Sequence, residues 1–239
     1  MRDFDAAGKA TQTALLVARL RAAGIEADSM SFPNYKTATG KLILKMLKGT
    51  HALCCGGQPG AAGRFRCDVA DNALALQSLM TANRYEQYEK LAEWSNKVSS
   101  NNPMAHSRDV PAVLVLDRYW LSGLVYGMAD GLDRAWLLAV HAALPPAHHI
   151  FIDVPAEEAL RRRLEARDRF ERDREKQARV LKNYRAEWQR AMLDEDVGPL
   201  RRRVWRVDGA AAPAAVEARV WTIVETTDPD RVRLFRGGA

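Results

Sequence analysis

Gly8 and Lys9 stand directly before a segment with helical periodicity, at the end of the opening run Asp5-Ala6-Ala7-Gly8-Lys9-Ala10-Thr11. Backbone amides at a helix N-terminus bind phosphate oxygens, and a lysine beside them reaches the outer phosphates of a nucleotide. Against the template G-x-x-x-x-G-K-[ST], Asp3 replaces the first glycine and Ala10 replaces the hydroxyl that binds magnesium. The run by itself leaves two interpretations open, a phosphate cradle and an ordinary helix start.

A second place suited to phosphate chemistry follows an apolar stretch. Ala112–Leu116 is typical of a buried strand and runs directly into Asp117 and Arg118. Phosphoryl transfer depends mainly on cations that are placed around the moving phosphate, and Arg118 is suited to that role. Asp117 is either an organiser of magnesium and phosphate or the carboxylate that ends a strand.

Arginines also crowd one short segment later in the chain. They are Arg167, Arg169, Arg172 and Arg174. A segment that carries such cations can close over ATP, contact the transferred phosphate and exclude water. Asp168, Glu171 and Asp173 lie between the arginines, so local ion pairing on a solvated helix surface is the alternative.

Helical segments alternate with short apolar strands, which predicts an α/β fold, a doubly wound parallel sheet with helices on both faces. The expected strands are Asp28–Phe32, Ala112–Leu116, Ile150–Val154 and Val204–Val207. The expected helices are Ala10–Ala23, Thr39–Leu47, Val69–Lys97 with a break near Asn83–Tyr85, Trp120–Met128, Leu132–Ala143, Ala156–Ala166, Asp173–Met192 and Ala214–Glu225. Because only Met1–Phe4 precede the opening run, we expect the first strand to be truncated or missing.

We expect a single domain over residues 1–225, with a helical lid at about 161–176. Residues 226–239 are polar and end in Gly-Gly-Ala, which is typical of a mobile tail.

The basic charge is local. The formal net charge is +6, and Glu157–Arg206 holds sixteen basic and eleven acidic residues. A nucleic-acid-binding surface more often spreads its basic residues over a face with interleaved aromatics. The pattern therefore favours nucleotide phosphates over nucleic acid as the anionic partner. The most apolar stretch, Ala135–Val154, contains three histidines, two prolines and an aspartate, which excludes a membrane span.

The cysteines are Cys54, Cys55 and Cys67. An odd number of cysteines without a signal peptide predicts reduced thiols and a cytoplasmic protein. His51 lies near them, but the spacing lacks the C-x-x-C pair of many zinc sites. Free thiols on a loop are favoured over a zinc site, and no metal ligand is assigned.

Several motifs follow one another in a fixed order. They are Asp5-Ala6-Ala7-Gly8-Lys9-Ala10-Thr11-Gln12, Phe32-Pro33-Asn34-Tyr35 with Thr39-Gly40, Ala82-Asn83-Arg84-Tyr85-Glu86, Asp117-Arg118-Tyr119 with Ser122 and Tyr126, and Phe151-Ile152-Asp153-Val154-Pro155 with Glu158. This order resembles that of the thymidylate kinase family, a branch of the P-loop nucleoside monophosphate kinases. The resemblance covers roughly Asp5–Glu225, and the segment that begins at Asp117 is its strongest single signal.

The resemblance implies ATP and dTMP as substrates, Mg²⁺ bound mainly through ATP, and a homodimer. It places the ATP phosphates on Ala6, Ala7, Gly8, Lys9, Ala10 and Thr11. It gives the catalytic roles to Lys9, Asp117, Arg118, Arg167 and Arg169. Because Ala6 and Ala7 are neutral, the chain resembles the branch of the family that carries its basic residues on the lid.

For the acceptor nucleotide, the resemblance implies one role for each matched position. Asp5 would accept the 3′-hydroxyl, Arg84 would lie beside the base, and Arg118 would hold the phosphate. Tyr126 would crowd a ribose 2′-hydroxyl, although an aromatic packing residue is the alternative at that spacing. The remaining positions of the expected acceptor site are Phe32, Tyr35 and Met80.

Departures from the family pattern keep two other functions open. Met80 stands where many relatives have an aromatic that stacks on thymine, and Tyr35 stands where many have an arginine. A kinase for another (deoxy)nucleoside monophosphate or for a deoxynucleoside is therefore the first alternative. Asp3 and Ala10 motivate the second, a nucleotide-binding protein without turnover.

Overall fold

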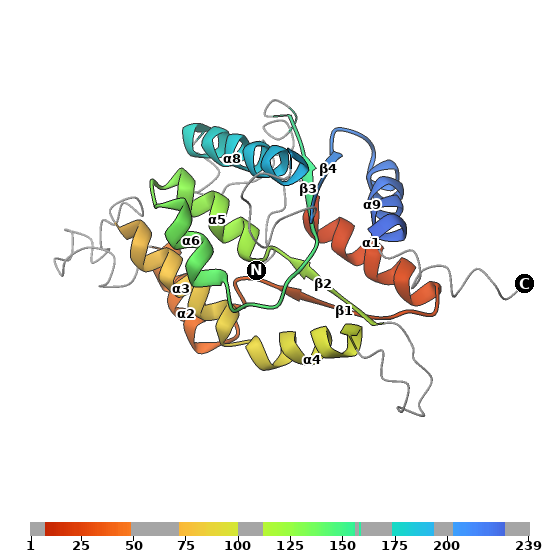
Figure 1. Cartoon of the computed structure of the whole chain (residues 1–239), viewed down its shortest axis with the longest axis horizontal. Helices are drawn as coiled ribbons and strands as arrows, with labels where there is room; N and C mark the ends of the chain where they lie inside the picture. Colours follow the sequence, from red (N-terminus) through yellow and green to blue (C-terminus); the bar gives the residue numbers. More distant parts are fainter. Residues whose placement is uncertain are drawn as a thin grey trace, which may run out of the picture. The chain divides into compact units, whose positions relative to one another are not determined.

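A computed structural model describes residues 8–48, 72–99, 112–155, 158, 174–193 and 203–227 (Figure 1). The chain divides into two compact units. The first unit comprises Met1–Met30, Ala92–Asp117 and Pro146–Ala239, and the second comprises Ser31–Leu91 and Arg118–Pro145.

The first unit holds the described strands, apart from the last residue of β1. β1 (Glu26–Ser31) pairs with β2 (Ala112–Asp117), and β3 (His149–Asp153) pairs with β4 (Val204–Asp208). The described helices that lie wholly in this unit are α1 (Lys9–Ala22), α8 (Arg174–Leu193) and α9 (Pro213–Thr227).

β3 and β4 are parallel, in a register that pairs His149 with Val204 and Asp153 with Asp208. Parallel neighbours need a long crossover connection, and α8 lies between the two strands in the chain. α8 packs against β4, and its Tyr184 ring stacks on Phe151 of β3 at 4.8 Å between centroids. This strand, helix, strand arrangement confirms the predicted α/β alternation.

The core of the first unit lies where α1 and α9 pack side by side, as Figure 1 shows. Both helices direct an apolar stripe inward because their buried positions recur at intervals of three or four residues. The buried residues of this core are Leu16, Val17, Leu20, Ile25, Ala27, Val207, Val216, Val220 and Trp221.

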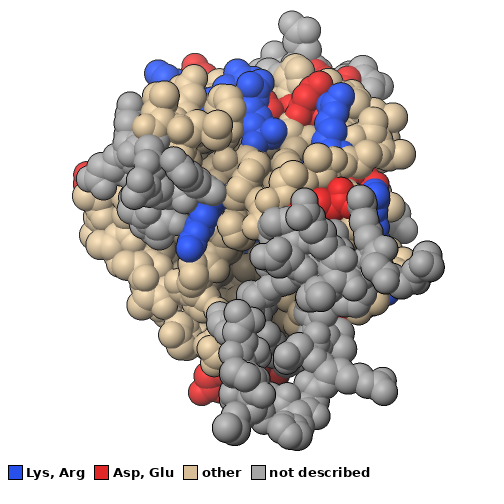
Figure 2. Space-filling model, turned by 45° about the vertical axis from the view of Figure 1, so that its right-hand side comes forward, with Lys and Arg blue, Asp and Glu red and all other residues tan. Residues whose placement is uncertain are grey.

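Ion pairs join neighbouring elements at the surface of the first unit. Arg19 of α1 contacts Glu217 of α9 at 3.0 Å, and Arg219 of α9 contacts Asp208 of β4 at 3.3 Å. Figure 2 shows basic side chains next to acidic ones on one face of the molecule. Exposed pairs of this kind contribute little stability, about 0 to 1 kcal/mol each.

Apart from the last residue of β1, the regular elements described in the second unit are helices. They are α2 (Ala38–Leu47), α3 (Ala73–Tyr85), α5 (Trp120–Ala129) and α6 (Arg134–His141); α4 (Tyr88–Ser99) begins in this unit and continues into the first. Side-chain caps explain two of the helix starts. The Thr37 hydroxyl accepts from the Gly40 amide at 3.1 Å, and the Asp133 carboxylate accepts from the Trp136 amide at 2.7 Å.

The predicted strands and helices within the described residues are confirmed, with ends that differ by a few residues. The break in the long helix falls at Glu86 and Gln87, just after the predicted position. α9 continues two residues beyond Glu225, into the predicted tail. The expected first strand, the helix Ala156–Ala166 apart from Glu158, the lid up to residue 173 and residues 228–239 lie outside the described residues.

Candidate functional site

The predicted phosphate cradle leads directly into α1. Gly8 is the N-cap residue, and its φ of 75° and ψ of 15° lie in the left-handed region that favours glycine. The Gly8 carbonyl accepts the first helical hydrogen bond from the Gln12 amide at 2.9 Å. Lys9 is therefore the first helical residue, at the end of α1 where backbone amides and the helix dipole favour an anion.

The chain turns sharply where β2 ends. Asp117 is the last residue of β2, and Arg118 follows with a φ of 60°. A non-glycine residue in the left-handed region carries local strain, and such strain is concentrated at functional sites. The turn carries the chain from the end of β2 to Tyr119, the N-cap of α5.

Arg118 and Tyr126 lie together in the second unit. Nη1 of Arg118 is 3.5 Å from the Tyr126 hydroxyl, and the guanidinium carbon lies 5.7 Å from the centre of the Tyr126 ring. The contact combines a weak hydrogen bond with a cation–π attraction. It places two of the residues predicted to bind the acceptor next to each other, one before α5 and one in its second turn.

Arg84 links α3 to the segment that follows β2. Its side chain is buried, with 3% of its surface exposed. Nη1 donates to the Met80 carbonyl at 2.9 Å, and Nη2 donates to the Tyr119 carbonyl at 3.2 Å. The two motifs that contain Arg84 and Arg118, more than thirty positions apart in the sequence, are therefore joined by a hydrogen bond.

Asn83, the neighbour of Arg84, fastens the segment 34–39 to α3. The Asn83 side chain is fully buried, and its Oδ1 accepts from the Asn34 amide at 2.7 Å. Its Nδ2 donates to the hydroxyls of Thr37 and Thr39 at 2.9 and 2.8 Å. This buried amide sets the position of the segment that carries Tyr35.

Glu86 holds the same segment from the end of α3. Its carboxylate accepts a hydrogen bond from the Thr39 hydroxyl and another from the Ala38 amide at 3.2 Å. The hydroxyls of Thr39 and Thr37 are the main causes that lower the pKa of Glu86 below its usual value. The start of α2 is thus held by a carboxylate that favours its charged form.

The other predicted acceptor residues also lie in the second unit. Tyr35 and Met80 are half-buried and pack against a cluster formed by Ile43, Met46 and Leu76. Phe32 is buried, and its ring lies 5.8 Å from that of Tyr119. Asp5, the remaining predicted acceptor residue, lies outside the described residues.

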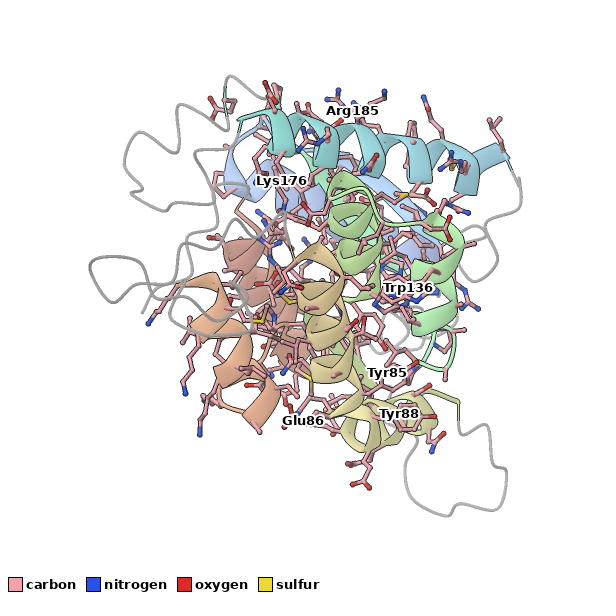
Figure 3. All side chains as sticks on the ribbon, turned by 90° about the vertical axis from the view of Figure 1, so that its left-hand side faces the viewer. Tyr85, Glu86, Tyr88, Trp136, Lys176 and Arg185 are labelled. Carbon is pink, nitrogen blue, oxygen red and sulfur yellow. The ribbon has the colours of Figure 1, made fainter. Side chains whose placement is uncertain are left out.

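Two tyrosines fix the ends of these motif segments. The Tyr85 hydroxyl donates to the Val140 carbonyl at 3.0 Å. The Tyr85 ring stacks on that of Tyr88, with 6.5 Å between the ring centroids; Figure 3 labels Tyr85, Glu86 and Tyr88. Tyr119 is buried and donates to the Pro145 carbonyl at 3.1 Å. Burial raises the pKa of Tyr119 well above its usual value, so the phenol stays protonated and donates.

The structure therefore gathers part of the predicted site. Phe32, Tyr35, Met80, Arg84, Arg118 and Tyr126 belong to the second unit, whereas Gly8, Lys9, Ala10, Thr11 and Asp117 belong to the first. Asp5, Ala6, Ala7, Arg167 and Arg169 lie outside the described residues. Sequence reasoning missed Asn83 and Glu86 as supports, although both stand inside a motif that it had singled out.

No group of three or more His, Cys, Asp or Glu side chains that could hold a metal ion occurs in the described ranges. None of the helices in that part of the chain is long and apolar enough to cross a membrane.

Comparisons with known proteins identify the family of the chain. The family model described as thymidylate kinase matches residues 69–198. A thymidylate kinase of Schizosaccharomyces pombe is 31% identical over 182 residues, which cover 76% of this chain and 71% of the relative. The human thymidylate kinase is 30% identical over 173 residues, which cover 72% of this chain and 67% of that protein.

A solved structure of thymidylate kinase from Candida albicans matches the fold. The TM-score is 0.64 with 22% identity, and the match covers 94% of this chain and 89% of that one. The solved structure shows the α/β fold, and the family model with the two relatives shows an ATP-dependent nucleoside monophosphate kinase. Within that class, the chain belongs to the thymidylate kinase family.

Proposed function

We propose that this protein transfers the γ-phosphate of ATP to dTMP and so forms dTDP. The observation that carries the proposal is the hydrogen bond from Arg84 to the Tyr119 carbonyl. It joins the two motifs through which the family resemblance assigns base and phosphate recognition. Arg118 and Tyr126, in contact beside that junction in the chain, would hold the acceptor phosphate and crowd a 2′-hydroxyl.

The start of α1 is suited to the donor nucleotide. Gly8 gives the left-handed N-cap, and Lys9 opens the helix. The proposed ATP site consists of Ala6, Ala7, Gly8, Lys9, Ala10 and Thr11. Amides at the helix start bind phosphate oxygens without any side chain, so Ala10 and Thr11 can take part through their backbone. The predicted Arg167 and Arg169 would add positive charge at the transferred phosphate.

The proposed ATP site is also suited to Mg²⁺, because Asp117 supplies a carboxylate. A carboxylate oxygen is the type of ligand that Mg²⁺ prefers, and Mg²⁺ usually keeps several waters and substrate phosphate oxygens as ligands. Asp117 is half-buried at the end of β2. When bound with ATP, the ion would neutralise charge on the β- and γ-phosphates. Asp117 would orient water or phosphate around it.

We further propose that the protein is cytoplasmic and forms a homodimer. The cytoplasmic location is supported by the three cysteines, which form no repeated C-x-x-C or disulfide-rich pattern. The homodimer is supported by the family resemblance alone. Sedimentation of the purified chain near twice its mass of 26.7 kDa would agree with it.

ADP release from ATP and Mg²⁺ with a panel of nucleoside monophosphates tests the activity. We expect dTMP to be the preferred acceptor. Lys9→Ala and Arg118→Ala should each lower kcat/KM about 100-fold or more, because each removes a cation from the reacting phosphates. Lys41→Ala, which removes an exposed cation from α2, is the matched control and should keep the wild-type rate.

Three outcomes would contradict parts of the proposal. A preference for a different monophosphate would replace dTMP as the acceptor. Binding of ATP without turnover on any acceptor would exclude the kinase activity itself. Equal rates for Lys9→Ala, Arg118→Ala and Lys41→Ala would show that the named cations do not act on the phosphates.

A further inference from the structure

Arg84 makes a third contact that neither the motifs nor the proposed reaction accounts for. In addition to the carbonyls of Met80 and Tyr119, its Nη1 lies 3.4 Å from Nε2 of His141. His141 is the last residue of α6 and only 3% exposed. The guanidinium predicted to lie beside the acceptor base is therefore held between α3, the start of α5 and the end of α6.

The contacts of His141 determine which of its ring nitrogens can accept. Nδ1 lies 2.6 Å from the Leu137 carbonyl, and because a carbonyl only accepts, Nδ1 carries the hydrogen. Nε2 is then the unprotonated nitrogen, facing the Thr81 hydroxyl at 3.2 Å and Arg84 Nη1 at 3.4 Å. Both partners can donate, so Nε2 presents its lone pair to the Thr81 hydroxyl and the Arg84 guanidinium together.

Two neighbours from α5 enclose this contact. A Cβ atom on Gly123 would lie 3.1 Å from Arg84 Nη1 and 3.1 Å from His141 Nε2, so glycine leaves room for the pair. The Trp120 ring stacks on the imidazole at 6.3 Å between centroids. Burial, and secondly the charge of Arg84, lowers the pKa of His141 to about 4, which keeps the ring neutral near pH 7.

We infer that His141 is a positioning residue for acceptor recognition: its neutral Nε2 orients the Arg84 guanidinium toward the base of the acceptor nucleotide. The inference rests on the proposed function. A neutral acceptor fixes the plane of the guanidinium and leaves its positive charge in place, whereas a carboxylate at this position would neutralise the charge. Arg84 then meets the nucleotide already oriented, which lowers the cost of ordering it on binding.

Steady-state kinetics on His141→Leu and His141→Gln test this role. Leucine keeps the apolar volume but removes the acceptor, so the KM for dTMP should rise about tenfold, the effect of one lost hydrogen bond to a charged group. The KM for ATP and kcat should stay within about twofold, because the contact orients a binding residue and touches no reacting atom. Glutamine restores an acceptor oxygen and should recover most of the dTMP affinity.

His149→Leu is the matched control. His149 is a second buried histidine, in β3 of the first unit, and burial likewise lowers its pKa, to about 3. Its replacement should lower stability without changing the KM for dTMP. Gly123→Ala is a second, independent variant because it crowds the Arg84–His141 contact and alters neither residue. It should raise the KM for dTMP as His141→Leu does, and it tests the contact if the leucine variant fails to fold.

An unchanged KM for dTMP in folded His141→Leu, or in Gly123→Ala, would overturn the positioning role. So would an equal rise for ATP and dTMP, or a glutamine variant no better than leucine, because these results indicate a purely structural residue. If the wild type binds dTMP without phosphorylating it, the proposed reaction fails separately. Calorimetric Kd values for dTMP should then still differ about tenfold between wild type and His141→Leu. If the wild type does not bind dTMP, both proposals are wrong.

Discussion

Asn83→Leu removes the amide that fastens residues 34–39 to α3, and the size of the effect follows from its contacts. Three well-formed hydrogen bonds disappear, to the Asn34 amide and to the hydroxyls of Thr37 and Thr39. Each is worth about 1 kcal/mol net, and leucine fills a similar volume, so no large cavity opens. The free energy of unfolding should fall by about 3 kcal/mol, with a further penalty if the Asn34 N–H stays buried without an acceptor.

Urea unfolding followed by circular dichroism measures this change. With a slope of about 3 kcal/mol per molar urea, the midpoint should fall by about 1 M. Asn96→Leu, an exposed position on α4, is the control and should change stability by less than about 0.5 kcal/mol. A midpoint for Asn83→Leu that falls no further than that of Asn96→Leu would refute the reasoning about the buried network.

Three further predictions concern stability. Gly40→Ala places a Cβ only 1.8 Å from the Asn34 carbonyl oxygen, so the thermal midpoint should drop by the equivalent of about 3 kcal/mol, well beyond the drop for Gly131→Ala, where positive φ is strained but space is open. Asp153→Asn removes a buried carboxylate that pairs with Arg185 at 3.0 Å and Arg206 at 2.7 Å. Because both arginines are nearly half exposed, the free energy of unfolding measured in urea should fall by about 2 kcal/mol. The exposed Asp208→Asn is the control and should change it almost not at all. The pKa of His141 is lowered from 6.5 to about 4, so between these pH values the unfolded chain binds more protons than the folded chain. The free energy of unfolding should therefore fall as the pH drops from about 6.5 toward 4, by about 2 kcal/mol at pH 5. Urea titrations at several pH values should show a shallower decline in His141→Gln.

Much of the fold could be predicted because its elements are short and strongly patterned. β2 is apolar from Ala112 to Leu116, and α1 carries its buried Leu16 and Leu20 one turn apart, so both elements follow from local sequence. The end of α3 was harder to predict from the sequence. The helix continues through Tyr85 because Asn83 and Tyr85 hydrogen-bond to distant segments, and such tertiary contacts override the weak local preference to break.

The candidate site could be predicted only where a residue matches a motif. Arg84, Arg118 and Tyr126 were named from the resemblance, and all three belong to the second unit. His141 was not, because a single histidine near the end of a helix carries no spacing signal for chemistry. Its importance arises from contacts with Thr81 and Arg84, each more than fifty positions away in the sequence. Periodicity contains no information about such pairs.

The run from Asn83 to Glu86 shows why one short motif can affect recognition in two separable ways. Successive residues on a helix point about 100° apart, so Asn83 faces the segment 34–39 while Arg84 faces the start of α5 and His141. A change at Asn83 removes bonds that hold the backbone of a neighbouring segment, and it must therefore lower stability along with dTMP affinity. A change at His141 touches none of the bonds that hold that segment, and among the predicted acceptor residues it directly affects the orientation of Arg84. Variants at the two positions should thus differ in the ratio of lost affinity to lost stability, which a common structural role would not produce.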